Sequence, residues 1–131
     1  MYNNVSWDCI HITDNKAIDE LSVDTEGVIT LHYDCKAVVS KNEFIAKIAD
    51  IFKFPDYFGA NWDALLDCLC DTSAWMPAKG YVLVIHNADY FIRNLTMEYG
   101  MFNEVWLDAA EFHAGANISF HLIYVVERSS S

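Results

Sequence analysis

The apolar run YVLVIH, at residues 81–86, most constrains what this chain can fold into. It is short for a helix and lacks the alternation of a strand with one solvated face, so it predicts a strand buried on both faces of a parallel sheet. Two further segments rich in β-branched and aromatic residues, VITLHY at 28–33 and ISFHLIYVV at 118–126, are also predicted to be strands. We therefore expect a buried sheet at the centre of the fold.

Helix signals follow the first predicted strand. Ser40 and Glu43 have the spacing of a capping box, which predicts a helix beginning at Lys41. Pro55 disfavours helical backbone in the residue before it, so this helix is predicted to end there. A second helix is predicted to begin at Asn61, because asparagine is a favoured N-cap residue.

The rest of the chain continues the alternation of helices and strands. The second helix is predicted to run to about Cys70, and residues 71–80, which include a proline and end in a glycine, are predicted to form a loop. Residues 88–95 suit a short helix and residues 103–114 a last one. This order gives an α/β fold, a parallel sheet with right-handed crossovers that is flanked by helices.

The length of the chain, 131 residues, fits a single domain (residues 1–131). We assign residues 28–126 to its core, residues 1–27 to an N-terminal extension packed on the domain edge, and residues 127–131 to a polar tail. Apolar residues make up 53% of the chain, which excludes a disordered acidic tail because so many apolar side chains favour burial.

Charge and cysteine content narrow the possible partners. Eight basic and nineteen acidic side chains give a net charge of −11, which disfavours direct contact with nucleic acid or an anionic membrane surface and favours a cationic partner. No apolar run approaches the length that spans a bilayer. The four cysteines lack the density of a disulfide framework, and no signal-peptide pattern precedes them, so we expect free thiols and a cytoplasmic location.

The segment FPDYFGANWDALLDCLCD, at residues 54–71, carries four aspartates and neither lysine nor arginine. On a helix, Asp63, Asp67 and Asp71 follow one another at steps of four along one face, and we name these three residues the acidic ridge. Like charges at this spacing repel, and the helix dipole opposes a negative charge near the C-terminal end. Local physics alone does not favour this arrangement.

Large side chains surround the acidic ridge. Tyr57, Phe58 and Trp75 flank it, and Gly59 allows a partner's backbone to approach closely. Aromatic groups beside charges that can be desolvated are typical of protein interfaces, and carboxylates spread along roughly 12 Å of helix imitate a phosphate backbone. We therefore expect a cationic, nucleic-acid-binding cleft as partner, with Trp75 exposed in the free protein and shielded in the complex.

The segment at residues 54–71 closely resembles the central motif of the barstar family, intracellular inhibitors of secreted ribonucleases of the barnase type. The motif combines a proline, an aromatic pair, a glycine, an asparagine and two aspartates four residues apart. The order of strands and helices over residues 28–126 is also similar to that family. The resemblance implies a small three-stranded parallel sheet flanked by helices and a one-to-one inhibitor without catalysis.

The resemblance also implies roles for individual residues. Tyr57, Gly59 and Asn61 would line the contact from the loop side, and Asp63 and Asp67 would reach cationic side chains of the nuclease, with Asp67 in the position of a substrate phosphate. The expected partner-binding surface consists of Tyr57, Gly59, Asn61, Asp63, Leu66, Asp67, Cys70, Asp71 and Trp75.

The chain departs from the family's prototype at several positions. Leu66 stands where the prototype has a tryptophan, and residues 71–80 are longer than its turn, leaving Trp75 as a possible substitute. An acidic contact on the last helix would fall to Asp108 or Glu111. These differences bear on which nuclease is bound.

Two other functions remain open. The chain could be an immunity protein against another cationic toxin, such as a DNase or an interbacterial effector. Alternatively, Asp63 and Asp67 could be the acid and base of an enzyme, or ligands of Mg²⁺. Carboxylates on a solvated helix usually do neither, because perturbed groups gather in clefts.

No cofactor or metal is expected from the remaining polar residues. The five histidines are scattered and have no metal-ligand spacing, so we expect core or surface roles for them: His11, His32, His86, His113 and His121. Cys68 and Cys70 project in different directions from a helix, so they are not expected to hold one zinc ion; we expect Cys68 to be buried and Cys70 to be a partly exposed thiol.

Overall fold

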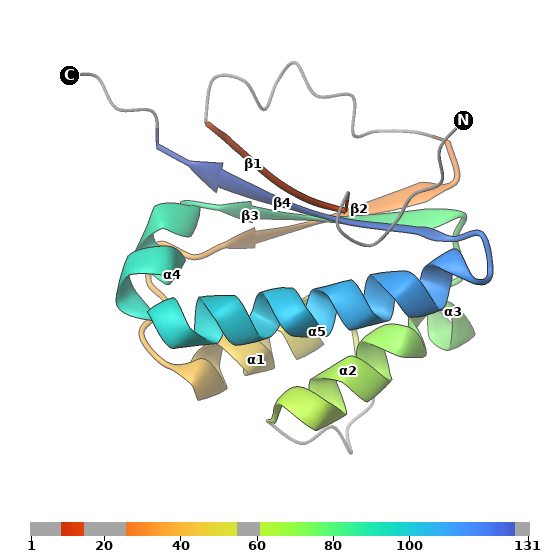
Figure 1. The fold of residues 1–131 in the computed structure, drawn as a ribbon, viewed down its shortest axis with the longest axis horizontal. Coiled ribbons are helices and arrows are strands. Elements are labelled where there is room, and N and C mark those ends of the chain that lie inside the picture. The colour runs from red at the N-terminus through yellow and green to blue at the C-terminus, as the bar shows by residue number, and fades with distance from the viewer. Residues whose placement is uncertain (1–8, 15–25, 55–60, 128–131) are drawn as a thin grey trace.

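The structure, a computed structural model, describes residues 9–14, 26–54 and 61–127. Within them the chain forms one four-stranded sheet with the spatial order β1-β4-β3-β2, and every neighbouring pair is parallel (Figure 1). The strands are β1 (Ile10–Asp14), β2 (Val28–Asp34), β3 (Gly80–His86) and β4 (Ser119–Val126). The predicted parallel α/β arrangement and the three predicted strands are confirmed.

The sheet has four strands, so the expectation of three was wrong. The additional strand, β1, lies in the N-terminal extension and pairs with β4 from Ile10 opposite Leu122 to Asp14 opposite Val126. Ile12 is 61% exposed at this edge of the sheet. A five-residue edge strand with little burial has no clear apolar pattern, which is why the sequence did not predict it.

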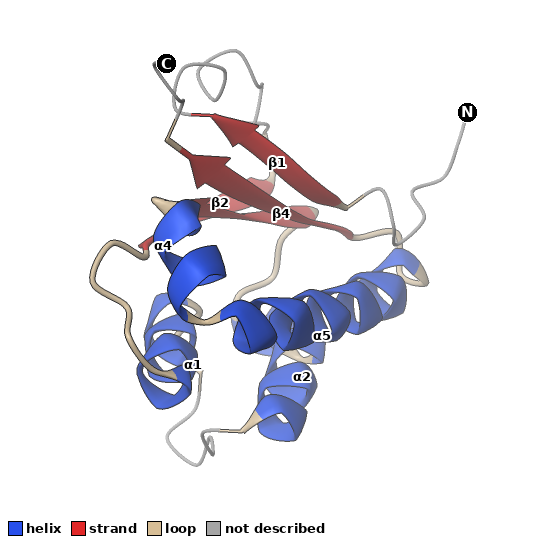
Figure 2. Cartoon of the chain, turned by 60° about the vertical axis from the view of Figure 1, so that its left-hand side comes forward, coloured by secondary structure: helices blue, strands red, loops and turns tan. Residues whose placement is uncertain are grey.

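The helices lie on one side of the sheet (Figure 1 and Figure 2). They are α1 (Lys41–Ile51), α2 (Trp62–Cys70), α3 (Thr72–Trp75), α4 (Ala88–Asn94) and α5 (Thr96–Ala114). In both views α5 runs along the sheet and α2 lies beyond it, farther from the strands. None of the helices in the described part of the chain is long and apolar enough to span a membrane.

The predicted limits of α1 and α2 agree closely with the structure. The N-cap of α1 is Ser40, whose Oγ accepts a hydrogen bond from the Glu43 N–H at 3.1 Å. At the other end, Lys53 adopts the left-handed conformation with φ 59°, and the Phe54 N–H donates to the Ala49 carbonyl at 2.9 Å. This closing turn follows the end of α1 at Ile51, and Pro55, predicted to stop the helix, lies outside the described residues.

Two helix predictions were wrong. Residues 71–80, predicted to be a loop, contain the single-turn helix α3. The last helix begins at Thr96 and not at residue 103, and its N-cap, Leu95, makes no side-chain cap hydrogen bond. Without a polar cap, and with Gly100 inside the first turns, the sequence gives no signal of this helix start.

Replacing Gly100 by alanine should raise the free energy of unfolding by about 1 kcal/mol, because alanine restricts the unfolded chain and favours the helix. Outside its chain neighbours and the backbone of its own helix, a Cβ at Gly100 would meet no atom within 4 Å. The same substitution at Gly27, where φ is 86°, should lower stability. Urea unfolding of both variants measures the two changes in the free energy of unfolding. A change in the same direction in both variants would contradict the prediction.

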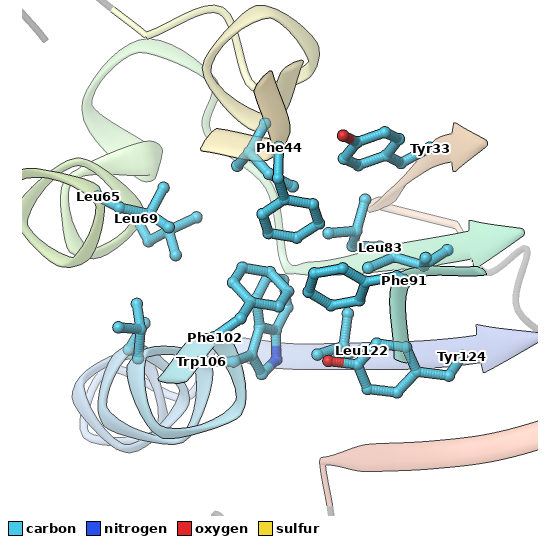
Figure 3. Close-up of a cluster of buried hydrophobic side chains, with 14 of the residues drawn as sticks. Tyr33, Phe44, Leu65, Leu69, Leu83, Phe91, Phe102, Trp106, Leu122 and Tyr124 are labelled. Atoms are coloured by element: carbon cyan, nitrogen blue, oxygen red, sulfur yellow. The ribbon is translucent and has the colours of Figure 1, made fainter. Parts of the chain in front are cut away.

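The main core lies between the sheet and the helices and is largely aromatic (Figure 3). Phe44 of α1 stacks on Phe91 of α4 with ring centroids 4.2 Å apart, and Phe102 of α5 meets Phe44 edge-on at 4.9 Å. Trp106 stacks on Phe120 at 4.3 Å. This cluster fixes α1, α4 and α5 on the sheet.

The central strand β3 is buried on both faces, as its sequence predicted. Tyr81, Leu83 and Ile85 belong to the main core, whereas Val82 and Val84 form a second buried cluster with Ile123 and Val125 of β4. We call the sheet surface that carries this second cluster the far face, because it is turned away from the main core and the helices.

Candidate partner-binding surface

Seven of the nine residues predicted to contact a partner lie within the described residues. They are Asn61, Asp63, Leu66, Asp67, Cys70, Asp71 and Trp75. The other two, Tyr57 and Gly59, lie outside the described residues. All seven belong to α2, to its caps or to α3, so the structure brings them to one region of the molecule.

The two faces of α2 differ completely in burial. Leu65 and Leu69 are fully buried and point into the core (Figure 3). Asp63, Asp67 and Asp71 are exposed on the other side of the helix. The predicted amphipathic helix with an acidic ridge is therefore confirmed as a structural feature.

Hydrogen bonds brace α2 at both ends. The Asn61 Oδ1 accepts a hydrogen bond from the Ala64 N–H at 2.8 Å, which confirms Asn61 as the N-cap. At the C-terminal end, the Leu69 carbonyl accepts from the Thr72 hydroxyl at 2.9 Å and lies 2.9 Å from the His113 Nε2 of α5. Both Thr72 and His113 are buried. The acidic ridge is thus held on a rigid support.

The negative charge of the acidic ridge is not compensated by the cations that the structure describes. Across residues 9–14, 26–54 and 61–127, the one ion pair within 4 Å joins Arg93 to Asp89 of α4, at 3.8 Å. Asp63, Asp67 and Asp71 form no ion pair with any described lysine or arginine. A cationic partner would find these carboxylates available.

Cys70 lies between the charged and apolar sides of α2 and is half-buried. Burial and, after it, the negative charges of Asp71, Asp67 and Asp108 together raise the pKa of its thiol to about 11. Asp108 belongs to α5, so a carboxylate from a second helix lies near the end of the acidic ridge. Cys70 and Asp108 are therefore close in the fold although they are distant in sequence.

Alkylation of Cys70 by iodoacetamide at pH 8 should be about 100-fold slower than that of an ordinary thiol, because a pKa near 11 leaves little thiolate. The Asp71→Asn variant removes one of the charges that raise this pKa, so its Cys70 should react faster. Mass spectrometry of the modified peptide measures the rate. A Glu127→Gln variant should react like the wild type, and an Asp71→Asn rate no faster than wild type would contradict the assignment.

Trp75 is half-buried, so the expectation that it is solvent-exposed was wrong. Its indole Nε1 donates a hydrogen bond to the Phe52 carbonyl at 3.0 Å, and its ring meets Phe54 edge-on at 5.9 Å. These contacts attach α3 to the end of α1. The loop prediction missed them because the partners are more than twenty residues away in sequence.

The sequence also gave no sign of two histidine pairs, which the strand register creates. The His32 Nδ1 lies 2.9 Å from the His86 Nε2, and the His11 Nε2 lies 3.3 Å from the His121 Nδ1. Among the residues that the structure describes, no three His, Cys, Asp or Glu side chains are placed to hold a metal ion together. His113, in contrast, is a core residue, as expected.

Comparison with known proteins gives one informative match. The family model described as "Barstar (barnase inhibitor)" matches residues 28–125. No curated protein matches the sequence. A chain in the solved structure described as "Structure of Drosophila ORC bound to AT-rich DNA and Cdc6" is 13% identical with a TM-score of 0.47. That match covers 91% of this chain but only 40% of the other, and a likeness this low carries no argument.

Proposed function

We propose, from the premise that this chain belongs to the barstar family of barnase inhibitors, that it inhibits a cationic ribonuclease by occupying its active site. The observation that carries the proposal is the exposed acidic ridge of α2, which no described cation neutralises. A nuclease must bind phosphates, so its active site is cationic, and the acidic ridge is complementary to it in charge.

The rigidity of α2 supports this role. A partner surface that is already ordered loses little conformational entropy on binding, and it therefore binds more tightly than a flexible segment with the same charges. The N-cap of α2 and the hydrogen bonds at its C-terminal end hold Asp63 and Asp67 at a fixed spacing. About 6 Å of helix axis separates these two residues, at about 1.5 Å per residue.

The proposed contact surface combines the residues predicted from the sequence with one from α5. Asp67 takes the position of a substrate phosphate, Asp63 reaches a second cationic side chain, and Asp108 extends the negative surface beyond the end of α2. The remaining proposed contacts are Tyr57, Gly59, Asn61, Leu66, Cys70, Asp71 and Trp75. Trp75 contributes the part of its ring that is neither hydrogen-bonded to the Phe52 carbonyl nor packed against Phe54.

In this proposal the chain is an inhibitor and carries out no catalysis of its own. It acts as a single domain bound one-to-one in the cytoplasm, without contacting nucleic acid or a membrane. Complementary charge should speed the association of the two proteins, and added salt should slow it, because screening acts on the long-range attraction.

The proposal is tested by titrating a barnase-type ribonuclease with the full chain and measuring cleavage of an RNA substrate. Inhibition should be complete at one equivalent, and excess substrate should compete with it. Absence of inhibition at a large excess of the chain would reject the ribonuclease assignment. Inhibition of a cationic DNase in a parallel titration would then identify the chain as an immunity protein against another toxin.

A further inference from the structure

The far face of the sheet carries four histidines in two pairs. His32 on β2 stands in register with Val84, and His121 on β4 with Val82, so both histidines share the face of the second buried cluster. His86 of β3 contacts His32, and His11 of β1 contacts His121. None of these residues lies on the proposed partner-binding surface.

We propose that each histidine pair is a chelating site for a divalent transition-metal ion such as Ni²⁺, Cu²⁺ or Zn²⁺. Imidazole nitrogen is a preferred ligand of these ions. In the metal-free protein one ring of each pair donates a hydrogen bond to the other. A bound ion would take the place of this hydrogen bond, and the donor ring, still neutral, would carry its proton on its other nitrogen. Water molecules complete the coordination. The inference does not depend on the proposed inhibitor function.

The distances between the ring nitrogens suit this role. At a metal–nitrogen distance of about 2.0–2.1 Å, two nitrogens bound at right angles are about 2.9 Å apart, and two bound at the tetrahedral angle are about 3.3 Å apart. The observed separations are 2.9 Å for His32 and His86 and 3.3 Å for His11 and His121. The nitrogens therefore already have the spacing of two ligands of one ion.

The arrangement of the pairs also allows an ion to enter. His32 and His11 are exposed, and His86 and His121 are half-buried, so each pair has one ring open to solvent. Asp34, which stands in register with His86, places a negative charge beside the first pair. The whole chain, with a net charge of −11, attracts cations.

Each pair joins an edge strand to its inner neighbour. His32 and His86 link β2 to β3, and His11 and His121 link β1 to β4. An ion bound by both members of a pair would therefore cross-link an edge of the sheet. It would stabilise the folded chain, since the unfolded chain does not hold the two rings together.

The test is calorimetric titration of the untagged full chain with NiCl₂, together with thermal unfolding. The wild type should bind two Ni²⁺ ions, His32→Gln one, and the double variant His32→Gln, His11→Gln none. At Ni²⁺ concentrations about 100-fold above the dissociation constant, the Tm of the wild type should rise by several degrees, and that of the double variant should not. His86→Gln should lose the same site as His32→Gln.

The acidic ridge and Cys70 supply the controls. An Asp63→Ala, Asp67→Ala variant and a Cys70→Ser variant should each keep both Ni²⁺ sites, since the proposal does not use these residues. Two sites remaining in the double histidine variant would place the ions elsewhere and overturn the proposal. Failure of the wild type to bind Ni²⁺ at millimolar concentration would overturn it as well.

Discussion

The double variant Asp63→Ala, Asp67→Ala should bind a barnase-type ribonuclease about 1,000-fold more weakly than the wild type, or worse, a loss of about 4 kcal/mol. Both carboxylates are exposed, and neither forms an ion pair with a lysine or arginine in the part of the chain that the structure describes. In the proposed complex they are desolvated against cations of the nuclease, and their removal leaves those cations buried without a partner. Truncating one member of such a pair is among the most costly interface changes.

Asp67 should account for the larger share of this loss. It lies at the middle of the acidic ridge, where an interface is most completely desolvated, and Asp67→Asn alone should weaken binding by about 30-fold or more, ~2 kcal/mol. The extreme values of the hot-spot range come from the barnase and barstar pair, which are relatives of this system, and we assign this chain only the lower part of that range.

Inhibition constants measured at several salt concentrations separate the specific contacts from general charge. The control variant is Glu26→Ala, Glu127→Ala, which removes the same number of charges at exposed positions beside the sheet. It should change the association rate slightly and leave the dissociation rate unchanged. Circular dichroism checks that each variant is folded. Equal inhibition by the acidic-ridge variant and the wild type would move the site away from α2.

Phe44→Ala should lower the free energy of unfolding by about 3–5 kcal/mol, a large part of the stability of an ordinary domain. Phe44 is fully buried, and its ring contacts Tyr33, Phe91 and Phe102, which belong to three different elements. Removing the ring leaves a cavity between α1, α4 and α5 that a rigid sheet cannot close.

Phe112→Ala is the matched control for this prediction. Phe112 lies on α5 and is 59% exposed, so the same substitution there should change stability by no more than about 0.5 kcal/mol. Urea unfolding monitored by tryptophan fluorescence measures both variants. Similar losses at the two positions would show that the aromatic cluster does not carry the stability assigned to it.

Local signals predicted the elements that depend on local chemistry. The capping residues Ser40 and Asn61 set the starts of α1 and α2, and the apolar run at 81–86 gave the central strand. β1 could not be predicted in the same way, because its stability comes from pairing with β4 and not from its own pattern. The start of α5 could not be predicted either, because it has no side-chain cap. Packing on the sheet supports this end of the helix instead.

The candidate site shows the same division. Spacing alone predicted the exposed face of α2, since a helix of known period fixes which residues share a side. The approach of Asp108 to Cys70 and the hydrogen bond from Trp75 to the Phe52 carbonyl depend on how separate helices meet. The histidine pairs depend on strand register, which no short motif encodes. These features required the tertiary structure.

The sheet order has a consequence for how the chain is made. β4 lies between β1 and β3, although it is the last of the four strands along the sequence. As the nascent chain leaves the ribosome, β1 has no strand to pair with, and one edge of β3 stays open until residues 119–126 have emerged. Pairings between such distant segments form slowly. The chain should therefore be able to inhibit a nuclease only after β4 has been synthesised. Until then, chaperones would have to shield its open strand edges.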